Sequence, residues 1–406
     1  MTPPPASLCI VGGGIVGLAT AHRAQSRWPH TKVTVLEKEP EVGQHQSGHN
    51  SGVLHAGLYY KPGSLKAQLA VNGIRRMIAF CQANEVAHEV CGKLVVAVTV
   101  DEIPRLKDLH ERGIANGLKG LRWCGPQEIR EREPHVNGVA AIEVPEEGIV
   151  DYRAVCRAMQ RNILKAGGDV KTGTALLGLS KEGNRWRCQT TAGETSADYL
   201  VNCAGLHCDR IMALTGETPS TRIVPFRGEY FKLRPQAESL VRHLVYPVPD
   251  PKFPFLGVHF TRMMAGGVEC GPNAVLAFDR EGYSWSRFSL RDTWDALSFP
   301  GLWRFLAKYP GMSWYEVKRS LSRPEFTRSL QRLVPDLQEA DLLPGGAGVR
   351  AQAMAPNGTL LQDFAIEMRP QALHLLNAPS PGATASLAIA DHLLDRIGGP
   401  AKLSAT

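Results

Sequence analysis

The chain opens with two short, mainly apolar runs separated by a helical pattern. Residues 8–11 and 32–36 are rich in β-branched side chains, which predicts two strands. Between them Ile15, Leu18 and Ala19 recur on one face of a predicted helix. We therefore predict a strand–helix–strand unit at the start of the chain.

The turn between the first strand and the helix carries a glycine motif. Gly12, Gly14 and Gly17 have the Gly-x-Gly-x-x-Gly spacing, and Glu37 follows the second strand. In nucleotide-binding units the glycines let the backbone approach a pyrophosphate, and the acid accepts hydrogen bonds from a ribose hydroxyl. The segment predicts a site for an adenine dinucleotide without a 2′-phosphate, and both FAD and NAD fit it at this point.

The rest of the pattern predicts a mixed α/β protein. Helical stripes begin at Ser64 and after the capping residues Asp101 and Asp151. Glycine, proline and charges are interspersed over 118–147, which favours connecting structure. Strands are expected over 93–100, 170–179, 186–190, 199–203, 223–233, 244–248, 256–261 and 372–377, and a last helix over 387–397. The long runs after residue 222, separated by prolines, indicate an antiparallel sheet.

The bulk composition excludes several classes of protein. With 43% hydrophobic and 21% charged residues and no run of about 18 uncharged apolar residues, the chain is typical of a soluble globular protein. Nine cysteines without a Cys-x-x-Cys pair favour reduced thiols, so no metal site is expected. The net charge of +7 suits an anionic substrate or an anionic membrane surface, and it does not indicate nucleic-acid binding. Because the first strand begins by Leu8, we expect no signal or transit peptide and a cytoplasmic location.

Tryptophans gather in one late segment. Trp285, Trp294, Trp303 and Trp314 lie among Arg and Lys within residues 283–320, which we predict to be helical. One interpretation is aromatic packing of a substrate-domain helix. The other is that the 285–314 region forms an amphipathic surface in peripheral contact with a membrane.

Two glycine-rich segments return late in the chain, at 345–352 (GGAGVRAQ) and 378–386 (APSPGATAS). Two such returns to one site are unusual in NAD dehydrogenases, so they favour FAD. In the second segment the turn at 381–384 opens a helix without an obvious side-chain cap. Its amides would suit the negative charge of a reduced flavin.

These segments resemble the D-amino-acid-oxidase-like flavoprotein superfamily, and within it the L-2-hydroxyglutarate oxidase/dehydrogenase branch. The resemblance spans nearly the whole chain. It rests on the glycine turn at 12–17 and on five more specific segments: 47–60 (SGHNSGVLHAGLYY), 225–230 (PFRGEY), 257–262 (GVHFTR), 348–352 (GVRAQ) and 377–386 (NAPSPGATAS).

The resemblance implies an α/β fold in which a Rossmann-like FAD-binding domain carries a discontinuous antiparallel-sheet substrate domain. The expected ranges are 1–90, 148–221 and 335–406 for the FAD-binding domain, and 91–147 and 222–334 for the substrate domain. The mammalian mitochondrial members of this branch carry a presequence, and we expect none here. A bacterial-type protein is therefore implied, cytoplasmic or peripheral on the inner face of the cytoplasmic membrane.

The motifs and the resemblance together imply a set of FAD contacts. From the glycine turn and the second strand these are Gly12, Gly14, Ile15, Val16, Gly17, Glu37 and Lys38. From the later segments they are Ser47, Gly48, Asn50, Ser51, Gly52, Val170, Ala204, Gly205, Gly348, Pro381, Gly382, Ala383 and Thr384.

Oxidation of a 2-hydroxy acid needs a base for the hydroxyl proton and cations for the carboxylates, while the flavin takes the hydride. His55 is the first candidate for the base, because the segment around it must wrap the flavin. Its alternative role is a hydrogen bond to the flavin or backbone, and His259 is the competing base. Arg350 is expected to bind the carboxylate next to the reacting carbon. Three further side chains are expected to line the substrate roof, unless they serve structural contacts: Arg227, Arg262 and Tyr230.

The leading functional hypothesis is FAD-dependent oxidation of L-2-hydroxyglutarate, a small dicarboxylate 2-hydroxy acid, to 2-oxoglutarate. The electrons would pass to oxygen or to a membrane quinone. An amine or amino-acid oxidase of the same fold, of the glycine- or sarcosine-oxidase type, is the enzymatic alternative. A flavin-binding subunit without turnover is the third hypothesis.

Overall fold

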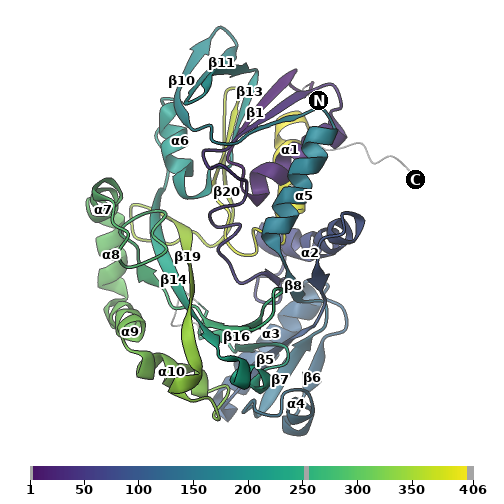
Figure 1. The fold of residues 1–406 in the computed structure, drawn as a ribbon, viewed down its shortest axis with the longest axis vertical. Helices are drawn as coiled ribbons and strands as arrows, with labels where there is room; N and C mark the ends of the chain where they lie inside the picture. Colours follow the sequence, from purple (N-terminus) through teal and green to yellow (C-terminus); the bar gives the residue numbers. More distant parts are fainter. Residues whose placement is uncertain (1–2, 251–255, 400–406) are drawn as a thin grey trace.

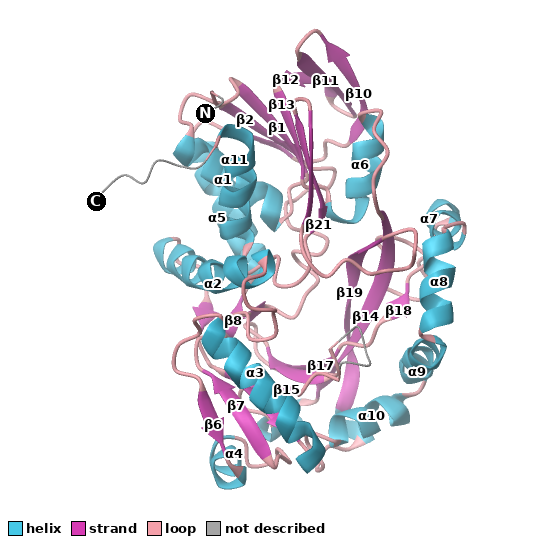
Figure 2. Cartoon of the chain, turned by 180° about the vertical axis from the view of Figure 1, so that it is seen from behind, coloured by secondary structure: helices cyan, strands magenta, loops and turns pink. Residues whose placement is uncertain are grey.

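The computed structural model of the chain describes residues 3–250 and 256–399. Two large sheets dominate it, one of six strands and one of nine. Figure 1 shows the six-stranded sheet towards the top and most of the nine-stranded sheet below it. Seen from behind, loops fill much of the region between the two sheets (Figure 2).

The six-stranded sheet contains the predicted strand–helix–strand unit. β1 (Ser7–Val11), α1 (Ile15–Arg27) and β2 (Lys32–Leu36) form it, which confirms that prediction. The strand order is β20-β21-β13-β1-β2-β9, and all neighbours are parallel except β20 and β21. The other members are β9 (Asp169–Lys171), β13 (Tyr199–Asn202), β20 (Ala365–Arg369) and β21 (Ala372–Asn377).

Both faces of this sheet are covered, which explains why its strands are apolar runs without alternation. Leu8 and Ile10 of β1 belong to the core that includes the helices, whereas Cys9 and Val11 pack with Trp186 on the other face. The helices are α1, α2 (Leu65–Ala83), α5 (Tyr152–Lys165) and α11 (Ser386–Gly398). The opposite cover is a three-stranded sheet of β10 (Leu176–Glu182), β11 (Arg185–Thr190) and β12 (Gly193–Ala197).

The nine-stranded sheet has the order β18-β14-β17-β16-β15-β5-β7-β6, with β19 on β14. Its pairs are antiparallel except β5 and β15, so an antiparallel sheet after residue 222 was a correct prediction. The strands are β5 (Lys93–Ala97), β6 (Arg122–Cys124), β7 (Ala140–Val144), β14 (Arg222–Leu233), β15 (Leu244–Pro247), β16 (His259–Arg262), β17 (Val268–Gly271), β18 (Val275–Leu276) and β19 (Leu342–Met354).

Helices and a small sheet complete the fold. β3 (Val53–Leu54), β8 (Gly148–Val150) and β4 (His88–Glu89) form a three-stranded sheet. α3 (Ile103–Ala115) and α4 (Pro126–Arg132) contact β7, and α6 (Cys208–Leu214) contacts β21. Four helices follow one another along one side of the molecule (left in Figure 1): α7 (Leu290–Leu297), α8 (Pro300–Lys308), α9 (Pro310–Leu321) and α10 (Arg323–Gln331).

Several local predictions were wrong. Residues 118–147 contain β6, α4 and β7 rather than mere connections. No strand was predicted for the glycine-rich segment 345–352, which lies inside the long strand β19 that pairs along β14. β19 therefore joins the nine-stranded sheet, although the predicted FAD-binding range 335–406 includes it; the domain boundaries themselves stay a prediction. Asp101 is not a helix cap, since it lies within a short 3-10 turn that precedes α3.

Candidate active site

The glycine turn has the geometry that a pyrophosphate site requires. Gly12 has φ +111°, and a Cβ there would lie 2.5 Å from the carbonyl oxygen of Cys203. A Cβ at Gly17 would lie 2.0 Å from the carbonyl oxygen of Gly12, so only glycine lets α1 start against the strand. α1 has no side-chain cap at Gly14. Apart from the amide of Ile15, which binds Ser47 Oγ, the backbone amides of this N-terminus are therefore suited to phosphate oxygens.

Glu37 closes this turn at the end of β2. Its carboxylate is nearly buried and accepts hydrogen bonds from the amides of Gly13 (2.7 Å) and Glu39 (2.8 Å). Each carboxylate oxygen keeps acceptor capacity beyond the one amide that it binds. The buried acid beside the glycine turn fits the ribose of an adenine dinucleotide.

The segment after β2 is folded tightly by its own side chains. Ser47 Oγ accepts the amide of Ile15 (2.9 Å), and Asn50 donates to the carbonyls of Gln46 and Ser47. The Asn50 side-chain oxygen also accepts the amide of Gly52 (2.9 Å). Ser47 and Asn50 therefore shape the segment from within, while their contact with FAD stays a prediction.

The remaining predicted cofactor residues come from four other elements. Val170 lies in β9 opposite Val35 of β2, and Ala204 and Gly205 follow β13. In β19, a Cβ at Gly348 would lie 2.5 Å from the carbonyl oxygen of His49, so this strand closely approaches the 47–60 segment. The turn at 381–384 precedes α11, whose N-terminus has no side-chain cap.

Thr384 ties that turn to the backbone of His55. Its hydroxyl accepts the amide of His55 (3.2 Å) and lies 2.6 Å from the hydroxyl of Tyr152. Tyr152 in turn donates to the carbonyl of Val53 (3.0 Å). The two segments that the sequence predicted to meet at the flavin are thus joined directly.

A buried charge network lies beside His55. Nδ1 of His55 is 3.5 Å from Oε2 of Glu147, and Nζ of Lys93 is 2.6 Å from the same oxygen. Burial opposes ionisation of Glu147, but the charge of Lys93 and the hydrogen bond with His55 lower its pKa to about 2. Burial lowers the pKa of Lys93, and Glu147 opposes that fall. Lys93 also lies over the rings of Tyr59 (4.6 Å) and Tyr246 (4.9 Å).

His259 belongs to the same neighbourhood. Its ring packs edge-on against Tyr246 with centroids 3.9 Å apart, and its Nδ1 lies 2.9 Å from the carbonyl oxygen of Gly257. Burial lowers the pKa of His259 to about 3, with smaller contributions from the charges of His55, Lys93 and Arg350. The imidazole is therefore neutral at physiological pH and is a weak acceptor for a proton.

Arg350 lies on β19 opposite Phe226 of β14. Burial lowers its pKa, and nearby Tyr230 and Glu316 oppose the fall. Burial raises the pKa of Tyr230 to about 12, and the charge of Arg350 opposes this rise. Arg350 and Tyr230 are thus electrostatic neighbours, and Arg350 also acts on His259.

Arg262 is not brought to this cluster. Side chains alternate along β16, so Arg262 points away from the face of His259. Its guanidinium forms a bidentate, partly exposed pair with Glu89, at 3.1 and 2.9 Å. Arg227 is likewise engaged elsewhere, because it binds Glu229 (2.9 Å) and lies 4.2 Å from the ring centre of Trp285. For both arginines the geometry is that of a structural ion pair.

From the sequence, Glu147 was not identified as a site residue and Lys93 could not be placed. Glu147 lies in the stretch interpreted as connecting structure, and no local motif marks it. Lys93, like Lys61, was a cation that could lie near the site, but the sequence alone could not place it. They meet because β5 pairs with β7, just before the turn that carries Glu147.

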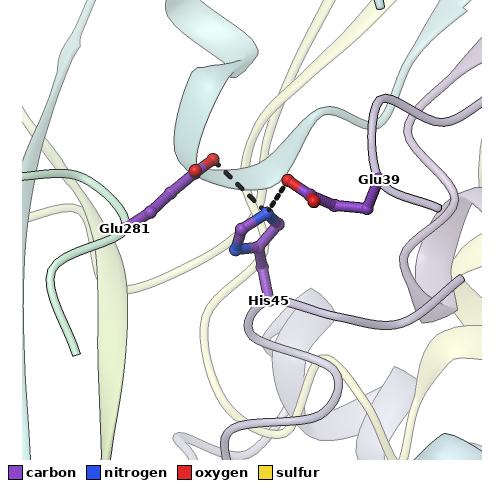
Figure 3. A group of neighbouring side chains, drawn as sticks. All are labelled: Glu39, His45 and Glu281. Atoms are coloured by element: carbon purple, nitrogen blue, oxygen red, sulfur yellow. Dashed lines mark hydrogen bonds and ion pairs between the residues drawn. The ribbon is translucent and has the colours of Figure 1, made fainter. Parts of the chain in front are cut away.

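A second cluster brings Glu39, His45 and Glu281 together (Figure 3). Their potential ligand atoms lie within 4.8 Å of one another. Nζ of Lys38 lies 2.7 Å from Oε1 of Glu281 and 3.0 Å from Nε2 of His45, so an ammonium group already neutralises the acids. We interpret the cluster as an ion-pair network. The Lys38 side chain takes part in it, and a contact of Lys38 with FAD stays a prediction.

Comparison with known proteins identifies the family. The model of the family described as "FAD dependent oxidoreductase" (DAO) matches residues 7–396. The chain belongs to this family. FAD is its cofactor, as predicted, and the D-amino-acid-oxidase-like fold is confirmed.

Relatives with known names are similar over nearly the full chain. The L-2-hydroxyglutarate dehydrogenase of Indibacter alkaliphilus is 49% identical, covering 94% of this chain and 96% of the relative. That of Escherichia coli strain K12 is 44% identical, covering 96% and 92%. The human mitochondrial L-2-hydroxyglutarate dehydrogenase is 43% identical, covering 96% and 88%. The resemblance to this branch is therefore confirmed.

Solved structures share the fold at lower identity. L-α-glycerophosphate oxidase from Mycoplasma pneumoniae with FAD bound has a TM-score of 0.79 at 23% identity, covering 98% of this chain and 99% of that one. Glycine oxidase from Geobacillus kaustophilus has a TM-score of 0.72 at 18% identity, covering 98% and 95%. At these identities the similarity establishes the fold alone.

Proposed function

We propose that this enzyme oxidises L-2-hydroxyglutarate to 2-oxoglutarate. The observation that carries the proposal is the similarity to L-2-hydroxyglutarate dehydrogenases, at 43–49% identity over 94–96% of this chain. The site supports it, because a histidine held by a carboxylate lies in the same neighbourhood as a half-buried arginine.

The proposed chemistry divides between cofactor and protein. FAD, when bound, takes the hydride from carbon 2 at its N5. Nε2 of His55 accepts the proton of the substrate hydroxyl, since Nδ1 faces Glu147. Arg350 binds the carboxylate next to carbon 2, and Tyr230 lies beside it.

Anaerobic reduction of the bound FAD tests the substrate. We expect L-2-hydroxyglutarate to bleach the flavin absorbance within one turnover, with D-2-hydroxyglutarate, glycine and sarcosine at least about 100-fold slower, because a buried polar site rejects ligands that leave its groups unpaired. Bleaching by glycine or sarcosine but not by the hydroxy acid would favour the amine-oxidase alternative. If FAD binds and no candidate reduces it, the non-catalytic subunit is the better hypothesis.

We also propose a peripheral membrane surface on the α7–α9 side. Large apolar side chains are exposed there: Trp285 (46%), Phe288 (57%), Leu290 (80%), Trp294 (74%), Leu297 (38%), Trp303 (55%), Trp314 (71%) and Leu321 (71%). The four tryptophans therefore do not pack into the core, against the first interpretation of this segment. Exposed Arg287, Arg291, Arg304 and Lys308 lie among them. Aromatic and basic side chains together suit an anionic lipid interface.

In this proposal the enzyme is cytoplasmic and docks on the inner face of the cytoplasmic membrane. The docked position favours a membrane quinone over oxygen as the electron acceptor. No helix among the described residues combines the length and apolarity needed to cross a bilayer.

Flotation with liposomes tests this surface. The FAD-loaded enzyme should float with vesicles containing about one-third phosphatidylglycerol at low salt. The triple variant Trp294→Ser, Trp303→Ser, Trp314→Ser should lose at least about 10-fold in binding, since interfacial affinity follows buried apolar area. Trp123→Ser, on the exposed strand β6, is the matched control and should float normally. Equal flotation of the triple variant, or no binding of the wild type, would refute the surface.

A further inference from the structure

Glu147 is a buried carboxylate whose two oxygens contact the His55 segment and Lys93. Its Oε1 accepts the amide of Ala56 (3.0 Å), the residue after His55. Its Oε2 faces Nδ1 of His55 (3.5 Å) and Nζ of Lys93 (2.6 Å). Its backbone carbonyl accepts the amide of Gly92 (2.8 Å), which adjoins Lys93. One side chain thus joins the β7–β8 turn, β5 and the His55 segment.

We propose that Glu147 is a positioning residue that acts through His55. It holds a proton on Nδ1 of His55, so that Nε2 carries the lone pair that accepts the substrate's hydroxyl proton. Lys93 fixes the carboxylate and keeps it ionised. The inference rests on the proposed function, in which His55 is the base.

The geometry favours orientation of His55 over a purely structural contact. The amide of His55 is held by Thr384, the next amide by Oε1 of Glu147, and the ring by Oε2 of the same carboxylate. Backbone and imidazole are therefore fixed relative to one group. Neutral histidine has two tautomers, and a carboxylate beside Nδ1 selects the one with the proton on that atom.

The same contact stabilises the product of proton transfer. When the hydroxyl proton moves to Nε2 and the hydride leaves with its electron pair, His55 becomes an imidazolium. The ionised Glu147 then lies next to this new positive charge, while its own proton state stays unchanged. In other enzymes, neutralising a carboxylate that has this role lowers the reaction rate by a large factor.

The charges around the pair come from several elements. Lys93 of β5 contacts Glu147 directly, and His259 and Arg350 lie within electrostatic range of His55 or its neighbours. Four tyrosines also lie within electrostatic range of Glu147, and burial keeps their hydroxyls neutral by raising the pKa of each of them: Tyr59, Tyr60, Tyr152 and Tyr246. Among these neighbours Glu147 is the group whose negative charge lies against His55.

The first test is Glu147→Gln in the FAD-loaded enzyme. We expect anaerobic flavin reduction by L-2-hydroxyglutarate to slow roughly 100-fold. Loss of the carboxylate disfavours the imidazolium, so the acid limb of the pH–rate profile should move to lower pH by roughly one unit. Glu146→Gln removes a neighbouring acid that pairs with Arg75 at the surface, and should leave both quantities unchanged. An unshifted acid limb in Glu147→Gln would overturn the proposal.

Glu147→Gln leaves Lys93 buried and unpaired, which can prevent folding. The double variant Lys93→Met, Glu147→Gln removes both charges and serves as the second test. Its readout is the ¹⁵N spectrum of the His55 ring in the FAD-loaded protein without substrate, assigned by difference from His55→Asn. We expect a protonated Nδ1 and a bare Nε2 in the wild type, and a mixture of tautomers in the double variant. A bare Nδ1 in the wild type, or an unchanged spectrum in the double variant, would contradict the inference.

These tests separate the inference from the function on which it rests. If His55→Ala reduces flavin normally, the base assignment fails whatever Glu147 does. If His55→Ala is slow while Glu147→Gln keeps the wild-type acid limb and tautomer, the base stands and the positioning role fails.

Discussion

Replacing His55 by alanine is expected to slow reduction of the bound FAD at least about 100-fold, while FAD stays bound. General-base catalysis typically contributes factors of this size or larger. His55 is the one histidine of the cluster that contacts a carboxylate, at 3.5 Å from Glu147, whose low pKa keeps it ionised. Anaerobic stopped-flow mixing with saturating L-2-hydroxyglutarate measures the step directly, and the flavin spectrum reports retention of FAD.

His110→Ala is a suitable control for this experiment. His110 lies on α3 and its ring packs edge-on against Trp123, which is part of the outer strand β6. Its loss should leave flavin reduction unchanged. A near-normal rate in His55→Ala would transfer the base to His259, despite the burial that lowers the pKa of His259 to about 3.

The elements at the start of the chain were predictable because their signals are local. β1, the glycine turn, α1 and β2 follow each other within about thirty residues, and each has its own pattern. The caps of α2 and α5 are also local, since Ser64 accepts the amide of Ala67 and Asp151 accepts that of Ala154. The cofactor class followed from these elements and from the late glycine segments.

The long-range pairings were not predictable from the same patterns. The glycines at 345–352 suggested a return of the chain to the flavin and no strand, yet β14 offers a partner strand along its whole length and pairs with them as part of β19. Glycine in that strand permits close approach, as at Gly348 beside His49. β7 similarly pairs with β5, about fifty residues away in sequence, and with β6 on its other side.

The residues of the candidate site differ in the same way: some lie in a local sequence motif, and others are recognised only from long-range strand pairing. His55 and Arg350 could be proposed because they lie in segments with a recognisable motif, and their placement now depends on β3, β8 and β19. Glu147 could not be proposed, because a single acid in a turn has no sequence signature. Its role is visible only in the structure, where pairing of β5 with β7 brings Lys93 to it. Arg262 was proposed from its strand alone, and the partner that occupies it, Glu89, is more than 170 residues away.

Replacing Arg350 by lysine is expected to weaken substrate binding about 10- to 100-fold, with a smaller change in the limiting rate of flavin reduction. A guanidinium binds a carboxylate through two parallel hydrogen bonds, whereas an ammonium acts as a point charge, and one charged hydrogen bond contributes about 1.5–3 kcal/mol. Arg350 is half-buried on β19, where partial removal from water strengthens its attraction to an anion. The dependence of the anaerobic reduction rate on substrate concentration yields the dissociation constant and the limiting rate separately.

Arg350→Met extends this argument to loss of the charge. Without it the substrate carboxylate is buried against apolar atoms, so binding should weaken by about 1,000-fold or more. Arg328→Lys, an exposed arginine on α10, is the matched control and should bind substrate normally. If Arg350→Lys and Arg350→Met both bind substrate with unchanged affinity, Arg350 does not bind the substrate carboxylate. A loss confined to the limiting rate would instead give Arg350 a role in the hydride-transfer step.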